Sequence, residues 1–156
     1  MHDIHGRCHC GNLELRLQSE TAPADFPVRA CQCSFCRKHG VRAVADPAGL
    51  VDITVHDADK LVRYQFGHKA AEFFVCANCG VYIAAVMDDG ERTYATLIVN
   101  SFDDHESFTG GPEPVSYLGE DEAGRRQRSG CDHVHRRDHG TTQGHSPQRR
   151  RAWNEP

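Results

Sequence analysis

Apolar and polar residues alternate in short runs along most of this chain, up to about residue 119. In the clearest run, NLELRLQ at 12–18, three leucines alternate with a glutamate, an arginine and a glutamine. A period of two sends successive side chains to opposite faces, which predicts a strand with one buried face. Similar runs, rich in β-branched or aromatic residues, lie at 51–55, 61–66, 72–75, 81–87 and 93–99. Together they predict a mainly β domain of about six to eight short strands.

Turn-forming residues separate these runs. DDGE at 88–91 is predicted to be a hairpin turn, because aspartate and glycine adopt the backbone conformations that tight turns require. SETAPADFP at 19–27 is predicted to be a loop. No segment shows a convincing amphipathic helical pattern, and only a turn or two of helix is expected around 35–40.

The alternation stops near the C-terminus, and the charge changes at the same place. Residues 124–156 contain eight arginines and three acidic residues, about +5, whereas the part before them holds ten Lys/Arg and nineteen acidic residues, about −9; the two sum to the net charge of −4. A basic segment with few apolar residues cannot bury enough surface to fold alone. We therefore predict a folded domain over 1–122 and a low-complexity, disordered tail over 123–156.

Charge and hydropathy also bear on the class of protein. An acidic body is a poor electrostatic match for a phosphate backbone, so we do not expect it to bind nucleic acid. The N-terminus lacks the apolar core of a secretory signal, and no run approaches the length of a membrane span. We expect a cytoplasmic protein without a membrane-spanning segment. In that compartment cysteines serve more often as metal ligands or catalytic thiols than in disulfides.

Seven of the eight cysteines fall into three clusters of the body, and Cys131 lies alone in the tail, where we expect a free thiol. The clusters are Cys8 and Cys10; Cys31, Cys33 and Cys36; and Cys76 and Cys79. Each pair supplies two ligands and is followed by a glycine that permits a tight turn. Two such pairs would complete a closed four-cysteine zinc site, which is the structural type.

The remaining cluster has one thiol too few for a closed tetrahedral site. Three protein ligands leave a fourth position open for water or substrate, as in catalytic zinc sites. Three alternatives stay open: ordinary buried cysteines, a redox pair, and a second closed site completed by a histidine. The candidate histidines for that closed site are His39, His5 and His9.

The three cysteine motifs together resemble a known family. GRCHCG at 6–11, CQCSFCRK at 31–38 and CANCG at 76–80 occur in the order and approximate separation found in the glutathione-dependent formaldehyde-activating enzyme family, which includes centromere protein V. The resemblance extends from about Gly6 to Glu122 and implies a β-tent fold with two zinc ions per chain. It assigns the structural zinc to Cys8, Cys10, Cys76 and Cys79, and the catalytic zinc to Cys31, Cys33 and Cys36.

The resemblance also implies an activity. The founding reaction of the family joins glutathione to formaldehyde and is classed with the carbon–sulfur lyases, so the expected partners are a small thiol and an aldehyde, with glutathione as co-substrate. Arg37 and Lys38 would hold the carboxylates of such a thiol, although both could equally be solvated surface charges. The segment 39–47 carries no obvious glutathione-binding residues. A non-catalytic zinc-binding interaction module and a redox sensor are the alternative functions.

Overall fold

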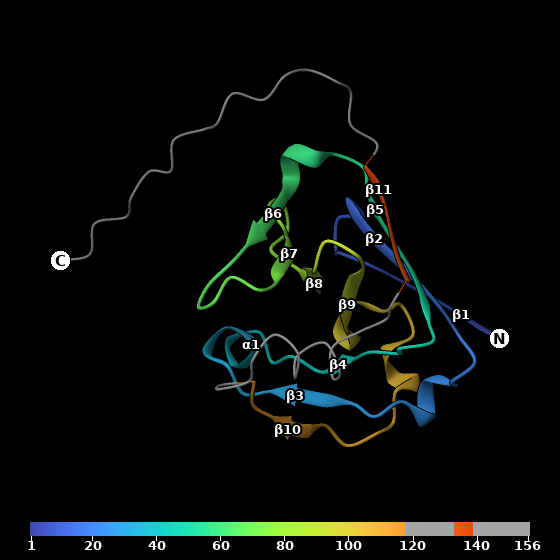
Figure 1. Cartoon of the computed structure of the whole chain (residues 1–156). Helices are drawn as coiled ribbons and strands as arrows, with labels where there is room; N and C mark the ends of the chain where they lie inside the picture. The colour runs from blue at the N-terminus through green and yellow to red at the C-terminus, as the bar shows by residue number, and fades with distance from the viewer. Residues whose placement is uncertain (118–132, 139–156) are drawn as a thin grey trace.

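Two β-sheets make up the structure, a computed structural model that describes residues 1–117 and 133–138. The smaller sheet has the order β1-β2-β5-β11, formed by His2–Arg7, Leu13–Ser19, Leu50–Val55 and His133–Asp138. The larger sheet has the order β10-β3-β4-β9-β8-β7-β6. Its strands are Glu113–Val115, Arg29–Cys31, Ala43–Val44, Thr93–Ile98, Tyr82–Asp88, Glu72–Cys76 and Leu61–Tyr64. Strands β3 and β10 run across the bottom of Figure 1, and the other sheet slopes down its right side.

Helical structure is sparse in the described residues. One short α-helix, α1 (Ser34–Lys38), follows β3. Four single-turn 3-10 helices lie in connections: η1 (Pro23–Asp25), η2 (Ala58–Lys60), η3 (Val99–Ser101) and η4 (His105–Ser107). No helix in the described ranges has both the length and the apolar character needed to cross a membrane. The prediction of a mainly β domain with a turn or two of helix around 35–40 is confirmed.

The main hydrophobic core lies between the two sheets. On β2 the alternating leucines Leu13, Leu15 and Leu17 are all buried, as the sequence pattern predicted. They pack with residues such as Ile53 of β5 and Phe74 of β7 in one cluster. All six predicted strands are present, and β8 and β9 pair around the predicted hairpin turn at 88–91.

Five short strands were not predicted from the sequence. β1 contains glycine and several polar residues, and β3 and β4 are only three and two residues long. β10 carries Pro114, a residue that lacks a donor for the ladder and is therefore confined to sheet edges. Such segments are held by pairing with neighbours and have no alternating pattern long enough to recognise.

The fifth of these strands, β11, corrects the prediction of a wholly disordered tail. Residues 133–138 pair in parallel with β5 along its full length, from His133 opposite Leu50 to Asp138 opposite Val55. The pairing satisfies the backbone groups of a strand that would otherwise be a sheet edge, and Val134 packs against the core. The rest of the predicted tail, 123–132 and 139–156, lies outside the described residues, as does Cys131. The boundary at residue 122 therefore stays a prediction.

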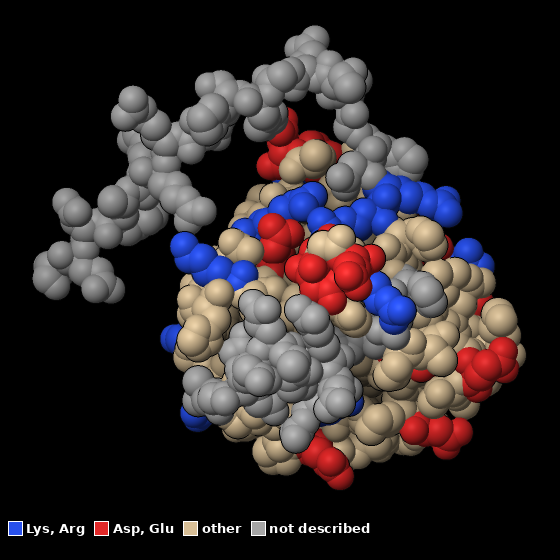
Figure 2. Space-filling model, viewed as in Figure 1, with Lys and Arg blue, Asp and Glu red and all other residues tan. Residues whose placement is uncertain are grey.

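Charged side chains of both signs lie on the surface shown in Figure 2. A band of Lys and Arg side chains crosses the upper part of that face and is interrupted by Asp and Glu side chains. Ion pairs among the described residues include Lys60 with Asp57, at 2.9 Å, and Arg63 with Glu72, at 3.5 Å. These two cations thus lie close to acidic neighbours.

Candidate metal centres and the cavity beside one of them

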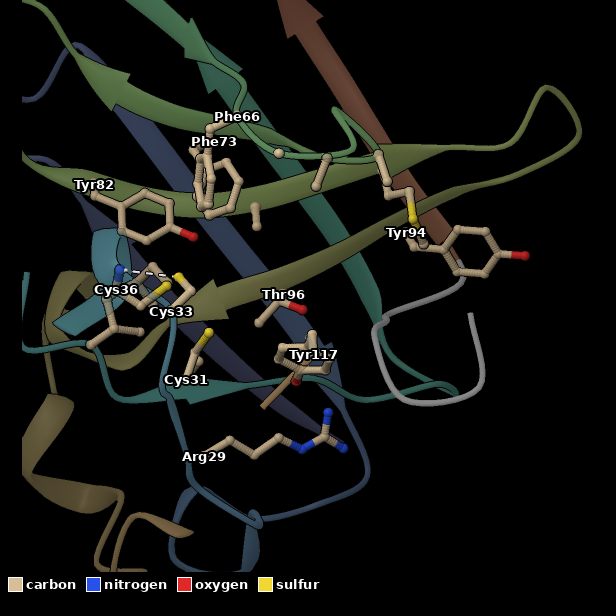
Figure 3. A pocket seen from close by; sticks show the side chains of 18 of the residues that line it. Arg29, Cys31, Cys33, Cys36, Phe66, Phe73, Tyr82, Tyr94, Thr96 and Tyr117 are labelled. Atoms are coloured by element: carbon tan, nitrogen blue, oxygen red, sulfur yellow. Dashed lines mark hydrogen bonds between the residues drawn. The ribbon is translucent and has the colours of Figure 1, made fainter. Parts of the chain in front are cut away.

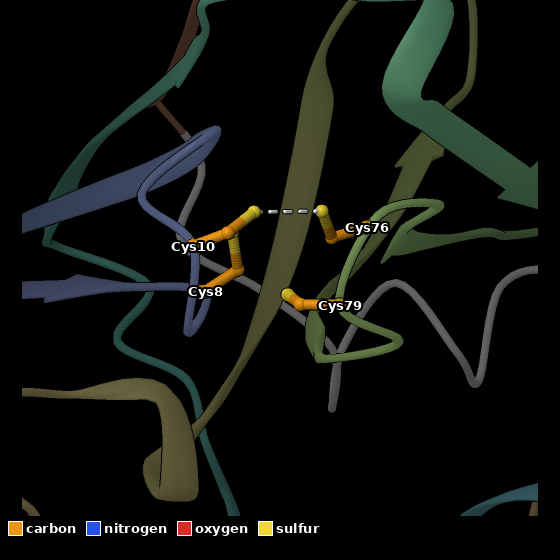
Figure 4. A group of neighbouring side chains, drawn as sticks. All are labelled: Cys8, Cys10, Cys76 and Cys79. Carbon is orange, nitrogen blue, oxygen red and sulfur yellow. Dashed lines mark hydrogen bonds between the residues drawn. The ribbon is translucent and has the colours of Figure 1, made fainter.

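Four cysteines meet where a turn of one sheet faces a turn of the other. Cys8 and Cys10 lie in the β1–β2 turn, Cys76 ends β7, and Cys79 lies in the β7–β8 turn (Figure 4). The Sγ atom of Cys10 is 3.7 Å from that of Cys8 and 3.5 Å from that of Cys76. We refer to these residues as the four-thiol cluster; all four sulfurs lie within 4.8 Å of one another. Four thiolates around one zinc ion, at about 2.3 Å each, place their sulfurs about 3.8 Å apart, so the cluster fits such an ion.

The glycines of these motifs shape the two turns. Gly11 and Gly80 have φ angles of 79° and 77°, a region that side chains disfavour. Their amides close the turns by donating to the carbonyl oxygens of Cys8 and Cys76, at 3.0 and 2.8 Å. The amide of Leu13 donates to the Sγ atom of Cys8 at 3.2 Å, the kind of outer contact that orients and stabilises a metal-binding thiolate.

Without a metal ion these thiols ionise at very different pH. A hydrogen bond from Asn78 is the main reason why the pKa of Cys10 is lowered to about 6. Burial raises the pKa of Cys76 to about 12 and also raises the pKa of Cys8. Since a zinc site needs all of its thiols deprotonated, metal binding at this cluster would release protons.

A second group of cysteines is built from one short segment. Cys31 ends β3, Cys33 precedes α1, and Cys36 lies within α1. Their sulfurs also lie within 4.8 Å of one another, and we call them the three-thiol cluster. The Sγ atom of Cys33 accepts a hydrogen bond from the amide of Cys36 at 3.3 Å, so the first turn of α1 helps to fix the position of the Cys33 sulfur.

Within the described ranges no histidine, carboxylate or further cysteine adds a fourth ligand atom to this group. His39, one of the candidates from the sequence, instead packs its ring against Phe35, at 4.4 Å between centroids, and against Tyr82, at 5.7 Å. His5 and His9 are not part of the group either. The described residues thus offer three ligands here and four at the other cluster.

Hydrogen bonding within the three-thiol cluster also separates the pKa values of its members. The bond from Cys36 lowers the pKa of Cys31 to about 6, and the same bond together with burial raises the pKa of Cys36. Burial raises the pKa of Cys33. In the absence of metal, negative charge therefore resides mainly on Cys31.

A cavity of about 220 Å³ opens beside the three-thiol cluster, and all three of its cysteines line it (Figure 3). None of the cysteines of the four-thiol cluster lines this cavity. The opposite wall comes from the face of the larger sheet that is turned away from the main core, together with the β6–β7 loop. Aromatic residues supply much of the lining: Phe66, Phe73, Tyr82, Tyr94 and Tyr117.

Phe35 joins this aromatic wall to the cysteines. Its ring lies 4.9 Å from that of Phe73 and 5.2 Å from that of Tyr82, both in edge-on contact. Tyr82 is buried, and its hydroxyl points toward the three-thiol cluster (Figure 3). Burial, reinforced by the negative charge of neighbouring thiolates, raises the pKa of Tyr82 well above its usual value. At neutral pH this hydroxyl is therefore a hydrogen-bond donor.

The comparison with protein families agrees with this arrangement. The sequence model of the family described as glutathione-dependent formaldehyde-activating enzyme matches residues 3–115, which include both clusters. The chain belongs to this family. A crystal structure of a Rhodobacter sphaeroides protein, a structural genomics target, is also similar: it is 27% identical, with a TM-score of 0.56, over 70% of this chain and 97% of that one. The resemblance noted from the cysteine motifs is thus confirmed at the level of the family.

In this member of the formaldehyde-activating family, the two residues predicted to contact the thiol substrate lie outside the cavity. Arg37 and Lys38 are exposed on the last turn of α1, and neither lines the cavity. Within the described part of the chain, Arg29 is the arginine that lines it. Arg29 was not predicted as a site residue because β3 was not recognised as a strand. Residues two apart on a strand face the same side, so a strand over 29–31 predicts that Arg29 lies beside Cys31. A role for Arg37 and Lys38 in binding a thiol remains a prediction.

The aromatic residues that line the cavity were also not predicted from the sequence. Tyr82 and Phe73 lie in runs that were predicted as strands, but their direction depends on the register between β7 and β8. That register shifts between Phe74 and Val75, which brings Tyr82 opposite Val75. No local sequence pattern predicts such a shift in register, and only the paired sheet shows which aromatic residues face the thiols.

Proposed function

We propose that this chain is a zinc-dependent enzyme of the carbon–sulfur lyase type, which forms and cleaves the adduct of a thiol with an aldehyde. The proposed substrates are glutathione and formaldehyde or a related aldehyde. One observation carries the proposal: the three-thiol cluster opens into a cavity large enough for a small substrate, whereas the four-thiol cluster does not line it. An open ligand position beside a cavity is what a catalytic zinc site requires.

The residues of the three-thiol cluster fit zinc in number, type and spacing. A zinc ion held by Cys31, Cys33 and Cys36 would supply Lewis acidity toward a carbonyl oxygen and would favour the thiolate form of a bound thiol. The walls of the cavity would hold the aldehyde against this cluster and keep bulk water away from it. Holding both reactants in one place removes much of the entropic cost of their encounter.

The reaction itself is an addition without net oxidation or reduction. A bond forms between the thiol sulfur and the aldehyde carbon, the π bond of the carbonyl breaks, and the thiol proton ends on the oxygen. Negative charge develops on that oxygen during the addition. The hydroxyl of Tyr82, which points toward the thiols, is placed to donate a hydrogen bond to it, an interaction that is strengthened in an apolar cavity.

The four-thiol cluster has a different proposed role, as a structural zinc site. It joins the β1–β2 turn of the smaller sheet to the β7–β8 turn of the larger one. A metal ion bound there would tie the two sheets together, and its binding free energy would stabilise the folded state. Two zinc ions per chain are therefore proposed, one structural and one catalytic.

Native mass spectrometry combined with exchange NMR tests this proposal. The first method counts zinc per chain, and the second measures how fast glutathione and formaldehyde interconvert with their adduct, which also forms spontaneously. We expect two zinc ions in the wild type, and in Cys33→Ala one zinc ion, a folded chain and no acceleration. Ser34→Ala, at an exposed neighbour, is the matched control and should behave as wild type.

Two results would contradict the proposal. If Cys33→Ala accelerated the exchange as well as the wild type, the three-thiol cluster would not be the catalytic site. If the wild type carried two zinc ions and accelerated no thiol–aldehyde exchange, the chain would be a zinc-binding interaction module and not an enzyme of this type.

A further inference from the structure

The lining of the cavity bears on which aldehyde this enzyme takes. We propose that its carbonyl substrate is an aldehyde with an aromatic or similarly bulky apolar group, and not formaldehyde. The inference rests on the proposed thiol–aldehyde reaction and narrows its substrate class. Size, wall chemistry and charge support it independently.

The size of the cavity exceeds what formaldehyde needs. A cavity of about 150 Å³ is enough to bind benzene, and a water molecule takes up about 30 Å³ in the liquid. Formaldehyde has two non-hydrogen atoms and would leave most of the 220 Å³ to water. An aromatic ring with its aldehyde carbon would fill this space and displace that water from the apolar wall.

The wall opposite the cysteines is suited to a flat apolar group. The rings of Phe66 and Phe73 lie 4.9 Å apart, and those of Phe73 and Tyr82 lie 5.7 Å apart, so the three form a continuous aromatic surface. Aromatic groups pack on such a surface in offset or edge-on geometry. Met87 and Ile98, which also line the cavity, add aliphatic surface from β8 and β9.

Charge argues against glutathione as the occupant of this space. The tripeptide carries two carboxylates and an ammonium group, which need several charged or polar partners when they are buried. Among the residues that the structure describes, 1–117 and 133–138, no acidic side chain lines the cavity, and the basic ones that do are Arg29 and His68. We infer that only the sulfur end of the thiol co-substrate reaches the three-thiol cluster, and that the aldehyde occupies the space beside the aromatic wall.

Ala85 is the position that keeps this space open. It lies in the middle of β8, opposite Phe73 on one neighbouring strand and Thr96 on the other, and it lines the cavity. Because its side chain is a single methyl group, the sheet is hollow between the larger side chains around it. Ala85→Leu would add three carbons at this point and remove space that an aromatic group needs.

Comparison of the kcat/KM values for two aldehydes tests the inference. The kcat/KM of the zinc-loaded protein is measured with benzaldehyde and with formaldehyde, each with glutathione and with 2-mercaptoethanol as the thiol. Loss of the benzaldehyde carbonyl absorbance reports one reaction, and exchange NMR reports the other. We expect kcat/KM for benzaldehyde to be at least tenfold higher with both thiols. The ratio should fall at least tenfold in Ala85→Leu and stay unchanged in Val62→Leu, which adds bulk at an exposed residue of β6 that does not line the cavity.

Binding without reaction gives a second readout. Benzyl alcohol, which cannot form the adduct, should show saturation-transfer NMR signals from its ring with the wild type and lose them with Ala85→Leu. Preference for formaldehyde, or a ratio unaffected by Ala85→Leu, would overturn the inference and leave the proposed function intact. No acceleration with any of the four thiol–aldehyde pairs would overturn the proposed function and the inference with it.

Discussion

The first glycine of the GRCHCG motif is predicted to be required for a reason other than turn geometry. Gly6 lies in β1, where the backbone passes directly over the end of η3 and forms an isolated bridge to Phe102. A Cβ atom at Gly6 would lie 2.5 Å from the carbonyl oxygen of Ser101 and 2.8 Å from the Cα atom of Phe102. Both obstacles are backbone atoms, so no side chain can rotate away to make room.

The cost of Gly6→Ala follows from these distances. Ordinary contacts between such atoms begin at about 3.5 Å, so β1 would have to move by about 1 Å. Overpacking of this kind costs about 1–3 kcal/mol, and the displacement would also weaken the bond in which the amide of Asp103 donates to the carbonyl oxygen of His5 at 2.9 Å. Adding about 1 kcal/mol for that bond, the free energy of unfolding should fall by about 2–4 kcal/mol. For a chain of this size the melting temperature should drop by roughly 5–15 °C.

Thermal and urea unfolding of the zinc-loaded protein measure this effect. Gly111→Ala is the matched control, because Gly111 has an ordinary backbone conformation and open space around its Cα atom. It should change the free energy of unfolding by no more than about 0.5 kcal/mol. Zinc release should also become faster in Gly6→Ala, since Cys8 begins the turn that directly follows β1. Equal stability of Gly6→Ala and Gly111→Ala would show that the close approach of β1 to η3 does not exclude a side chain at residue 6.

Three further predictions concern the cavity, the thiols and the last strand. Tyr82→Phe should lower kcat about 100-fold with little change in stability, because it removes one donor to the developing oxyanion; a kcat within twofold of wild type in steady-state assays would exclude that role. In protein stripped of metal, the pKa of Cys31 at about 6 means that its thiolate persists at neutral pH and disappears as the pH falls through 6, whereas Cys76, at about 12, stays protonated until strongly alkaline pH. Peptide mapping after iodoacetamide treatment should therefore find modification of Cys31 at pH 7 but little of Cys76, and identical pH profiles would contradict this. Val134→Ala should lower the free energy of unfolding by about 1 kcal/mol, while His135→Ala, at an exposed neighbour, should not. Equal free energies of unfolding in urea for the two variants would mean that the packing of Val134 in β11 does not stabilise the fold.

Some features of this protein follow from short-range sequence patterns. A leucine at every second position can bury one face only as a strand, so β2 was predictable from seven residues. The cysteine motifs could likewise be read from a few neighbouring residues each. Turns of a few residues fix how far apart their own sulfurs lie, and counting ligands was enough to pair Cys8 and Cys10 with Cys76 and Cys79.

Other features were decided by pairing between distant strands. The short strands β3 and β4 exist because longer neighbours hold them, and β11 forms along the edge of β5 although its own sequence is polar and basic. Their few residues carry too little pattern to outweigh the entropy of ordering them alone. These strands were therefore not predicted, and residues 133–138 were expected to be part of a disordered tail.

Sequence patterns alone predicted a mainly β domain, one set of four and one set of three clustered thiols, and the family of the chain. That the set of three opens into an aromatic cavity became visible only in the folded structure. That cavity depends on the register of β7 against β8, on Tyr82 facing the thiols, and on Arg29 sharing a strand with Cys31. Ligand spacing within a turn is a local property of the backbone, whereas the wall opposite the ligands is assembled from segments far apart in the sequence, whose relative positions are fixed only when the sheets pack.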